Sequence, residues 1–272
     1  MPDSPRNRRL RVRHVTIHDY DAPVGWGLLQ LRLRPKAHPG QRVLDWRVSV
    51  EGGRQELAFE DHHRNAVDLV NLHGGATRVV VACEGEVEVE DRAGVLGAHG
   101  GFAPLWLFGR ATPRTEPGPG VRRILRALPK AAGVERLHAL MAAVADAMAY
   151  EVGSSSVAGT AEDALAAGRG VCQDQAHAFV ACARALGVPA RYVSGYLLME
   201  DREAQDATHA WAEAWVEGLG WVGFDVANRM SPDARYVRVA TGLDYAEAAP
   251  VSGLRGGPGG ERLSVSVEVR PL

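Results

Sequence analysis

Cys172 stands where a thiol could act as a nucleophile. The segment GVCQDQAHAFVACARALG predicts a helix that begins at Val171 or Cys172 and ends at Leu186-Gly187, before a proline that cannot continue it. Four residues lie four, seven, eleven and fourteen positions after Cys172 and share its predicted helix face: Ala176, Phe179, Ala183 and Leu186. We therefore expect Cys172 in the first turn, on the face that packs into the protein. There the unpaired backbone N–H groups and the helix dipole favour a thiolate and could hold an oxyanion.

The base that such a thiol needs must come from elsewhere in the chain. The nearest histidine in sequence, His177, lies about 140° around the helix from Cys172 and cannot serve it. The segment THAWAEAWV alternates as a strand does, which places four side chains on one face: His209, Trp211, Glu213 and Trp215. The next strand, GWVGFDV, places another set on a common face: Trp221, Gly223 and Asp225.

The loop between these two strands decides whether Asp225 can orient His209. A two-residue turn made by Gly218-Leu219 would place the two side chains on opposite faces of the sheet. A three-residue loop with a glycine in the left-handed region would place them on the same face, as near diagonal neighbours. The hypothesis of a triad of Cys172, His209 and Asp225 therefore predicts an odd loop or a bulge at residues 217–220.

A thiol, an imidazole and a carboxylate together suffice for covalent acyl transfer. His209 would take the proton of the Cys172 thiol and return it to the leaving amine, while Asp225 would fix the tautomer of the imidazole. The intermediate would be a thioester. The other two cysteines, Cys83 and Cys182, are interpreted as small buried hydrophobic residues.

Four residues near this triad are weaker candidates for a role. Gln173 could donate to an oxyanion or face solvent. Trp211 could shape an acyl-binding groove, although large aromatic residues in strands usually pack in the core. Asp174 is expected to compensate the positive end of the helix. Glu213, on the strand face of the histidine, is a rival carboxylate for orienting it. Gln173 and Trp211 are therefore the candidate substrate-binding residues.

Histidines in the first half could suggest a metal site. His62, His63 and His73 would approach the ligand set of a catalytic zinc ion. However, the segment DHHRN is more typical of a turn before the strand AVDLVNL, and the chain has no loop of alternating acidic residues that would bind calcium. We therefore predict neither a metal nor another cofactor.

The elements that must position the triad follow from hydrophobic periodicity. From about residue 12 to residue 90 the alternation is strand-like, as in EGEVEVE, and residues 97–120 are rich in Gly and Pro. A helical pattern follows over about 133–150, and Thr160 with Asp163 forms a capping box for a short helix that Gly168 ends. The C-terminal LSVSVEVR alternates strictly and predicts a last strand that returns to a sheet.

This order of elements predicts an α+β fold in two parts. Residues 1–125 are expected to form an antiparallel β domain. Residues 126–272 are expected to form a core of helices and an antiparallel sheet, with the C-terminal return strand, in which Cys172 faces the sheet from a helix N-terminus. A chain of 272 residues is long enough to bury two modest cores.

Composition excludes several classes of partner. The chain has 31 Lys and Arg against 33 Asp and Glu, a formal net charge of −2, so no nucleic acid is implied. The first thirteen residues, MPDSPRNRRLRVR, are basic, but no apolar run follows them that could act as a signal sequence. Nowhere are there about eighteen consecutive apolar residues. We therefore expect a cytoplasmic protein that does not bind a membrane.

Three stretches resemble the core of the bacterial transglutaminase-like proteins, within the wider superfamily of papain-like cysteine enzymes. They are GRGVCQDQAHAFVACARALGVPARYVSGYL, THAWAEAWVEGLGWVGFDVANRM and ATGLDYAEAAPVSG, within about residues 150–255. The β-rich first half resembles the N-terminal domain that accompanies this core. Some positions depart from the family pattern: Gln175 stands in place of an aromatic residue, Val226-Ala227 in place of Pro-Thr, and Leu243 in place of an arginine.

The resemblance implies the same three catalytic residues that the geometry indicates: Cys172 as nucleophile, His209 as base and Asp225 as orienting carboxylate. It implies acyl transfer through a thioester from a Gln carboxamide or another amide carbonyl, on a protein, peptide or small amide substrate. Two alternatives stay open. The acyl acceptor could be water, as in a cysteine protease or amidase, or the fold could be a binding module without activity.

Overall fold

Strands fill the first third of the chain. The computed structural model describes residues 6–153, 158–200 and 203–272. Its first seven strands are β1 (Asn7–Tyr20), β2 (Trp26–Leu31), β3 (Gln41–Glu51), β4 (Gly53–Glu60), β5 (Ala66–Leu72), β6 (Arg78–Glu90) and β7 (Val95–Gly97). β1 begins before residue 12, where the alternation was expected to start. Two arginines of the basic N-terminal segment, Arg9 and Arg11, lie on its exposed face and pair with Glu86 of β6.

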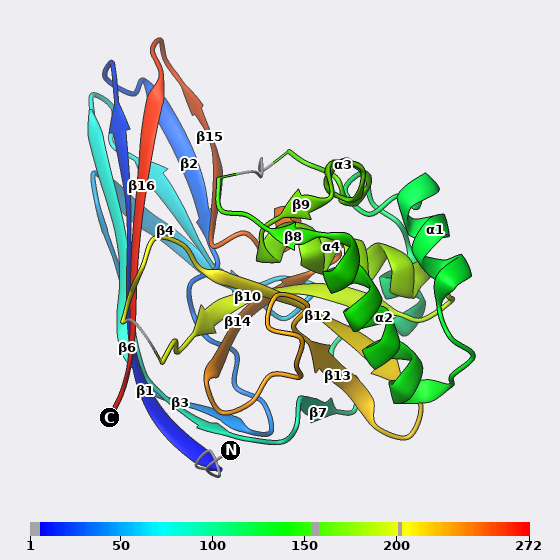
Figure 1. Cartoon of the computed structure of the whole chain (residues 1–272). Coiled ribbons are helices and arrows are strands. Elements are labelled where there is room, and N and C mark those ends of the chain that lie inside the picture. Colours follow the sequence, from blue (N-terminus) through cyan, green and yellow to red (C-terminus); the bar gives the residue numbers. More distant parts are fainter. Residues whose placement is uncertain (1–5, 154–157, 201–202) are drawn as a thin grey trace.

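Strands β1 to β6 form two sheets, and each of these sheets also includes strands from the second half of the chain. Their orders are β11-β16-β1-β6-β3 and β15-β2-β5-β4, where β11 is Ala204–Gln205, β15 is Val251–Gly256 and β16 is Glu261–Pro271. The predicted last strand is β16, which pairs antiparallel with β1 from Leu10↔Pro271 to Tyr20↔Glu261. In Figure 1 the blue first strand and the red last strand run side by side.

The second half combines helices with a third antiparallel sheet. The helices are η1 (Leu105–Gly109), α1 (Pro119–Ala127), α2 (Gly133–Ala147), α3 (Ala161–Ala167), α4 (Cys172–Ala185) and α5 (Tyr245–Ala248). The sheet has the order β14-β10-β12-β13-β7, with β10 Ala190–Leu197, β12 His209–Val216, β13 Gly220–Phe224 and β14 Tyr236–Gly242. A short parallel pair joins β8 (Ala149–Tyr150) to β9 (Arg169–Gly170). The α+β fold class is therefore as predicted.

Helix α1 was not expected, because it begins inside the stretch rich in Gly and Pro. Pro119 stands in its first turn, where a missing N–H costs nothing. The Glu162 carboxylate accepts hydrogen bonds from the backbone N–H groups of Gly118, Gly120 and Val121. An acidic side chain from α3 therefore supplies the N-terminal cap that the local sequence lacks. The predicted capping box of Thr160 and Asp163 is present at the start of α3 itself.

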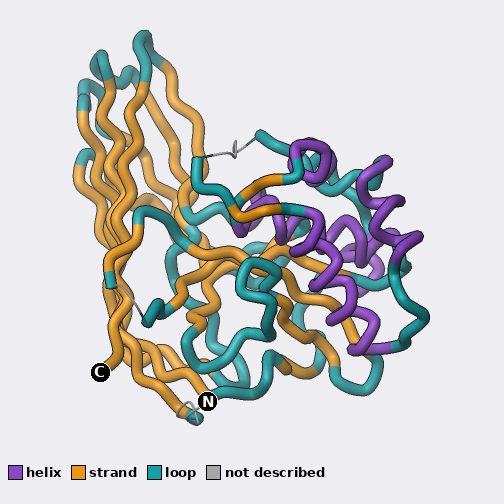
Figure 2. Tube along the Cα trace, viewed as in Figure 1, coloured by secondary structure: helices purple, strands orange, loops and turns teal. Residues whose placement is uncertain are grey.

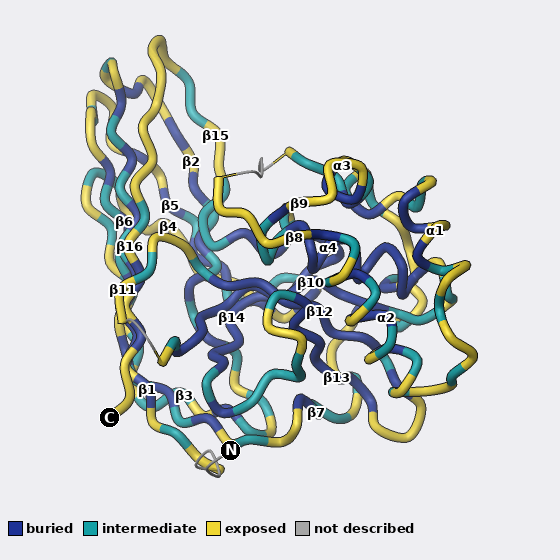
Figure 3. Tube along the Cα trace, viewed as in Figure 1, coloured by how far each residue is buried: buried dark blue, intermediate teal, exposed yellow. Residues whose placement is uncertain are grey.

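Helix α4 lies between the other helices and the third sheet. Figure 2 shows helices α1 to α4 gathered beyond that sheet, on the side away from the long strands of the first half. Every residue of α4 from Asp174 to Arg184 is buried, as the dark tube in Figure 3 shows. The expected division into a packed face and a solvated face was therefore wrong for this helix.

The hydrophobic core runs across both halves of the chain. One cluster joins the interior of the two N-terminal sheets, including Leu10 and Val81, to residues of the third sheet such as Tyr196 and Val239. A second cluster surrounds α4 and the inner side of β12. The boundary near residue 125 stays a prediction. Within the part of the chain that the structure describes, no helix is long and apolar enough to cross a membrane.

Candidate active site

Cys172 occupies the first position of α4, as the sequence predicts. Asp174 stabilises this end of the helix, because its Oδ2 accepts a hydrogen bond of 2.9 Å from the backbone N–H of Val171. Cys172 is partly exposed, whereas Cys83 and Cys182 are buried. Burial raises the pKa of each of these two thiols to about 12. Of the three thiols, Cys172 is therefore the one placed for reaction.

The loop between β12 and β13 has the odd length that the triad hypothesis requires. Val216 pairs with Gly220, which leaves residues 217–219 as a three-residue loop, and Gly218 has a φ of 80°. The pairing continues to Ala212↔Phe224. Asp225 therefore comes opposite the residue two positions beyond His209. The side chains of His209 and Asp225 consequently lie on the same face of the sheet. The predicted loop geometry is confirmed.

The side chains of His209 and Asp225 meet as this register requires. His209 Nε2 lies 2.7 Å from Asp225 Oδ2, and the two residues are 7% and 0% exposed. Cys172 lies close enough to the imidazole to raise the pKa of His209. Because Nε2–H donates to the carboxylate, Nδ1 is the ring atom left for the thiol. The three residues therefore lie together, with His209 hydrogen-bonded to Asp225 and next to Cys172.

Two further residues hold Asp225 in place, and the sequence analysis missed both. The Tyr236 hydroxyl donates to Asp225 Oδ2 at 2.8 Å, and Asn228 Nδ2 donates to the same oxygen at 2.7 Å. The backbone N–H of Asn228 donates to Oδ1 at 3.3 Å. The short spacing from Asp225 to Asn228 is typical of a polar turn and could have been noticed. Tyr236 comes from β14 and left no such signal.

The electrostatics of the site favour a protonated imidazole at His209. Burial alone would lower the pKa of His209, but the charge and hydrogen bond of Asp225, together with Cys172, raise it to about 10. Burial alone would raise the pKa of Asp225. The positive charge of His209 and the hydrogen bonds from His209, Asn228 and Tyr236 instead hold that pKa below its ordinary value. Asp225 therefore stays ionised and stabilises a protonated His209.

Cys172 and His209 open into a cavity of about 430 Å³. This volume is within the range of pockets that hold small ligands. Gln173 also lines the cavity, and its role in substrate binding stays a prediction. Trp211 does not line it. The indole is 2% exposed and lies stacked beside His209, with ring centroids 6.2 Å apart. Of the two candidate substrate-binding residues, only Gln173 reaches this cavity.

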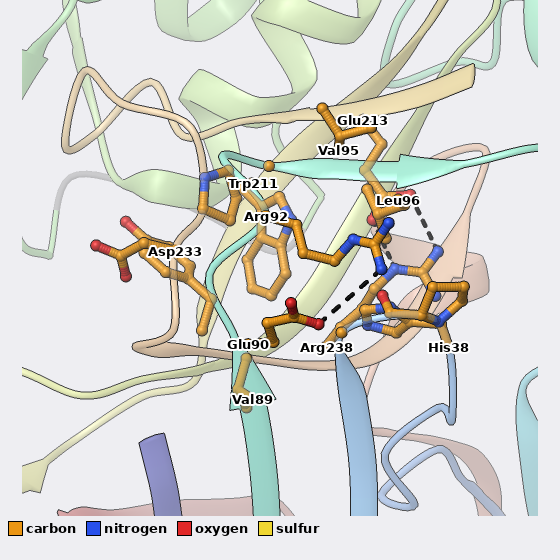
Figure 4. A pocket seen from close by; sticks show the side chains of 15 residues that line it. His38, Val89, Glu90, Arg92, Val95, Leu96, Trp211, Glu213, Asp233 and Arg238 are labelled. Carbon is orange, nitrogen blue, oxygen red and sulfur yellow. Dashed lines mark hydrogen bonds and ion pairs between the residues drawn. The ribbon is translucent and has the colours of Figure 1, made fainter. Parts of the chain in front are cut away.

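The rival carboxylate, Glu213, belongs to a different cluster. Its oxygens lie 2.5 Å from Arg191 Nε and 2.6 Å from Arg238 Nε. Burial opposes ionisation of Glu213, but the two guanidinium groups hold its pKa below the ordinary value. Figure 4 shows Glu213 and Arg238 joined beside Trp211, around a second cavity of only about 50 Å³. Glu213 therefore neutralises two buried arginines and does not orient His209.

Two of the three histidines that were considered for a metal site lie together in the structure. His62 and His63 lie near Glu247 of α5, with one possible ligand atom of each residue within 4.8 Å of the others. His63 Nε2 is 2.7 Å from Glu247 Oε2. His73 is not part of this group. The segment DHHRN forms the expected turn before β5. Among the residues that the structure describes, His62, His63 and Glu247 are placed so that they could hold a cation.

Two parts of the chain match known protein families. Residues 121–226 match the transglutaminase-like superfamily, and residues 10–88 match the bacterial transglutaminase-like N-terminal region. The chain therefore carries a transglutaminase-like core and a bacterial transglutaminase-like N-terminal region. The first match begins before the region of about residues 150–255 that the resemblance indicated and ends before its third stretch, and the second match covers the N-terminal strands. The catalytic roles of the three residues remain a proposal.

Individual relatives extend over different parts of this transglutaminase-like chain. An uncharacterized protein of Mycobacterium leprae is 29% identical over 278 aligned residues, which cover 97% of this chain and 99% of the relative. A protein-glutamine gamma-glutamyltransferase of Pseudomonas aeruginosa is 35% identical over 101 residues, which cover 32% of this chain and 14% of the relative. The crystal structure of a presumed cysteine protease from Cytophaga hutchinsonii has a TM-score of 0.79 at 20% identity, covering 98% and 91% of the two chains. This last likeness supports the fold.

Proposed function

We propose that the protein is a cysteine acyl-transfer enzyme. The observation that carries the proposal is the hydrogen bond from His209 to Asp225 next to Cys172, with Cys172 and His209 at the wall of the 430 Å³ cavity. The substrate class is a Gln carboxamide or another amide carbonyl of a protein, a peptide or a small molecule. Cytoplasmic localisation and a lack of membrane or nucleic-acid partners stay predictions from the sequence.

The proposed reaction proceeds through a thioester. The Cys172 thiolate attacks the carbonyl carbon, forming a C–S bond and an oxyanion that N–H groups at the start of α4 can stabilise. The C–N bond then breaks, and the imidazolium of His209 gives its proton to the leaving ammonia or amine. A second nucleophile, an amine or water, loses a proton to His209 and attacks the thioester. The thiolate leaves and the site is regenerated.

An assay with glutamine-containing peptides tests this function. The peptides are incubated with the protein with and without a fluorescent primary amine, and both ammonia release and amine incorporation are measured. Incorporation would identify a transglutaminase, and ammonia release that ignores the amine would identify an amidase. Cleavage of the peptide backbone would identify a protease. If the wild-type protein and the Cys172→Ala variant give the same products, the protein is a binding module without activity.

A further inference from the structure

One face of β16 changes from buried to exposed along the strand. Three side chains alternate on its core-facing row: Val267 is 1% exposed, Val265 is half-buried and Leu263 is 57% exposed. Val265 and Leu263 line the cavity that contains Cys172. The apolar row that packs in the core therefore continues into this cavity without being covered.

A second apolar group of the cavity comes from the segment around β8. Tyr150 and Val152 line the cavity and are 54% and 82% exposed. Tyr150 pairs with Gly170 of β9, and the backbone N–H of Glu151 donates to the Gly170 carbonyl oxygen at 2.9 Å. Gly170 is two residues before Cys172. This pairing therefore holds the second apolar group close to the start of α4.

Lysine, arginine and carboxylate side chains are scarce among the residues that line this cavity. Within the described part of the chain, the lining includes no lysine or arginine and a single carboxylate, that of Asp206. Large apolar side chains that are exposed together usually mark a binding site, because a ligand that covers them removes apolar surface from water. Here such side chains come from two segments far apart in the sequence and meet at one cavity. The cavity is therefore suited to an apolar group.

We propose that the substrate carries a large apolar side chain, such as that of leucine, near the carbonyl that Cys172 attacks. This side chain packs against four residues, which we call the apolar subsite: Tyr150, Val152, Leu263 and Val265. A cavity of about 430 Å³ has room for it together with the reacting amide. The inference rests on the proposed function, because Cys172 is taken as the reacting group. It assigns to the sheet that holds β1 and β16 a part in substrate selection.

Alkylation of Cys172 by matched electrophiles tests the apolar subsite. Chloroacetyl-leucinamide and chloroacetyl-asparaginamide carry side chains of similar size and no net charge, and both are also prepared with one or two glycines before the variable residue. Labelling rates at Cys172 are measured by mass spectrometry and divided by the rate of chloroacetamide in the same protein. For at least one length, the leucine probe should label wild type about tenfold faster than the asparagine probe, the effect of burying one leucine side chain. Equal rates at every length would overturn the subsite.

Variants of exposed residues show whether the leucine preference comes from this subsite. Leu263→Asn should lose most of the preference, and Leu263→Met, which keeps a large apolar side chain, should retain it. The control is Leu254→Asn on β15, which changes a leucine that is 74% exposed but does not line the cavity, and it should leave the preference unchanged. A preference that persists unchanged in Leu263→Asn, alone or combined with Val152→Ser, would contradict the proposal.

The chloroacetamide rate separates this subsite from the triad. If chloroacetamide labels Cys172 no faster than an unperturbed thiol, the result counts against the proposed function. The ratio of the leucine rate to the asparagine rate would still report on the apolar subsite, because it compares two probes at the same thiol.

Discussion

Asp225 is held more firmly than its position in the sequence indicates. Besides His209 it receives hydrogen bonds from Asn228 and Tyr236, and it is fully buried. The sequence could predict Cys172, His209 and Asp225, because a helix start and two alternating strands fix their positions. It could not predict Tyr236, because β14 reaches the site only through pairing with β10. Contacts of this kind depend on the tertiary fold and leave no local pattern.

Tyr236→Phe should lower kcat with little change in KM. The variant removes one donor from Asp225 while the contacts to His209 and Asn228 remain. The expected loss is about tenfold, since a hydrogen bond to a charged group contributes about 1.5 kcal/mol or more. Because the negative charge of Asp225 is then less stabilised by hydrogen bonds, it should attract the proton of His209 more strongly and raise the pKa of His209. The alkaline limb of the pH–rate profile should therefore move to higher pH. Steady-state kinetics against pH would measure both effects.

Tyr196→Phe is the matched control for this prediction. Its buried hydroxyl contacts His14 and Cys83 and does not touch the triad. The control should leave the alkaline limb in place. If the limb moves equally in both variants, or in neither, Tyr236 does not act through Asp225.

His209 should make the stability of the protein depend on pH. Its pKa is about 10 in the folded protein, raised against burial by Asp225 and Cys172, and about 6.5 in an unfolded chain. A raised pKa contributes stability that is complete below about pH 6.5 and is lost as pH rises towards about 10. The difference in melting temperature between wild type and His209→Gln should therefore shrink over this interval. A difference that grows with pH would contradict the assignment of the charged imidazole.

At the scale of elements, the β12–β13 hairpin decides whether a triad can exist. The alternation of both strands was predictable from the period of two, whereas the odd loop followed only from the requirement that His209 and Asp225 share a face. The sequence could not indicate that β7 would lie along β13. This pairing brings the backbone of Gly97 against Gly220.

Two glycines of the hairpin should respond differently to alanine. Gly218 has a φ of 80°, and an added Cβ would meet no atom within 4 Å, so Gly218→Ala should cost about 1–2 kcal/mol of backbone strain. Gly220 has a φ of 82°, and an added Cβ would lie 2.0 Å from the Gly97 carbonyl oxygen. Gly220→Ala should therefore cost about 3 kcal/mol or more. Urea unfolding would measure both values, and equal costs would contradict the packing of β7 on the hairpin.

At the scale of the whole molecule, the two predicted parts share a core and a sheet. β16 ends the chain beside β1, and one hydrophobic cluster extends from the N-terminal sheets to β10 and β14. The alternation in LSVSVEVR predicted a strand but could not name its partner, because strand pairing is decided by tertiary contacts. The N-terminal sheets and the core are therefore expected to unfold together.

Two buried thiols can report whether the N-terminal sheets and the core unfold together. Cys83 lies in β6 of the N-terminal sheet and Cys182 lies in α4 of the core. In a pulse-alkylation experiment both should become reactive at the same urea concentration. The double variant Val267→Ala, Val269→Ala should lower that concentration for both, since it removes roughly 3 kcal/mol of burial from β16. Ser264→Ala with Ser266→Ala, on the exposed face, is the control. If the urea concentration at which the thiol becomes reactive falls for Cys83 alone, the N-terminal sheets and the core are separate folding units.

The central claim is that His209 and Asp225 activate Cys172 as a nucleophile. The most direct test is the rate of iodoacetamide alkylation at each cysteine near pH 6.5, in wild type and in His209→Ala. Cys172 should react much faster than Cys83 and Cys182, and the variant should lose at least about tenfold of that rate. If Cys172 reacts at the same rate in both proteins, His209 does not activate the thiol and the proposed chemistry is wrong.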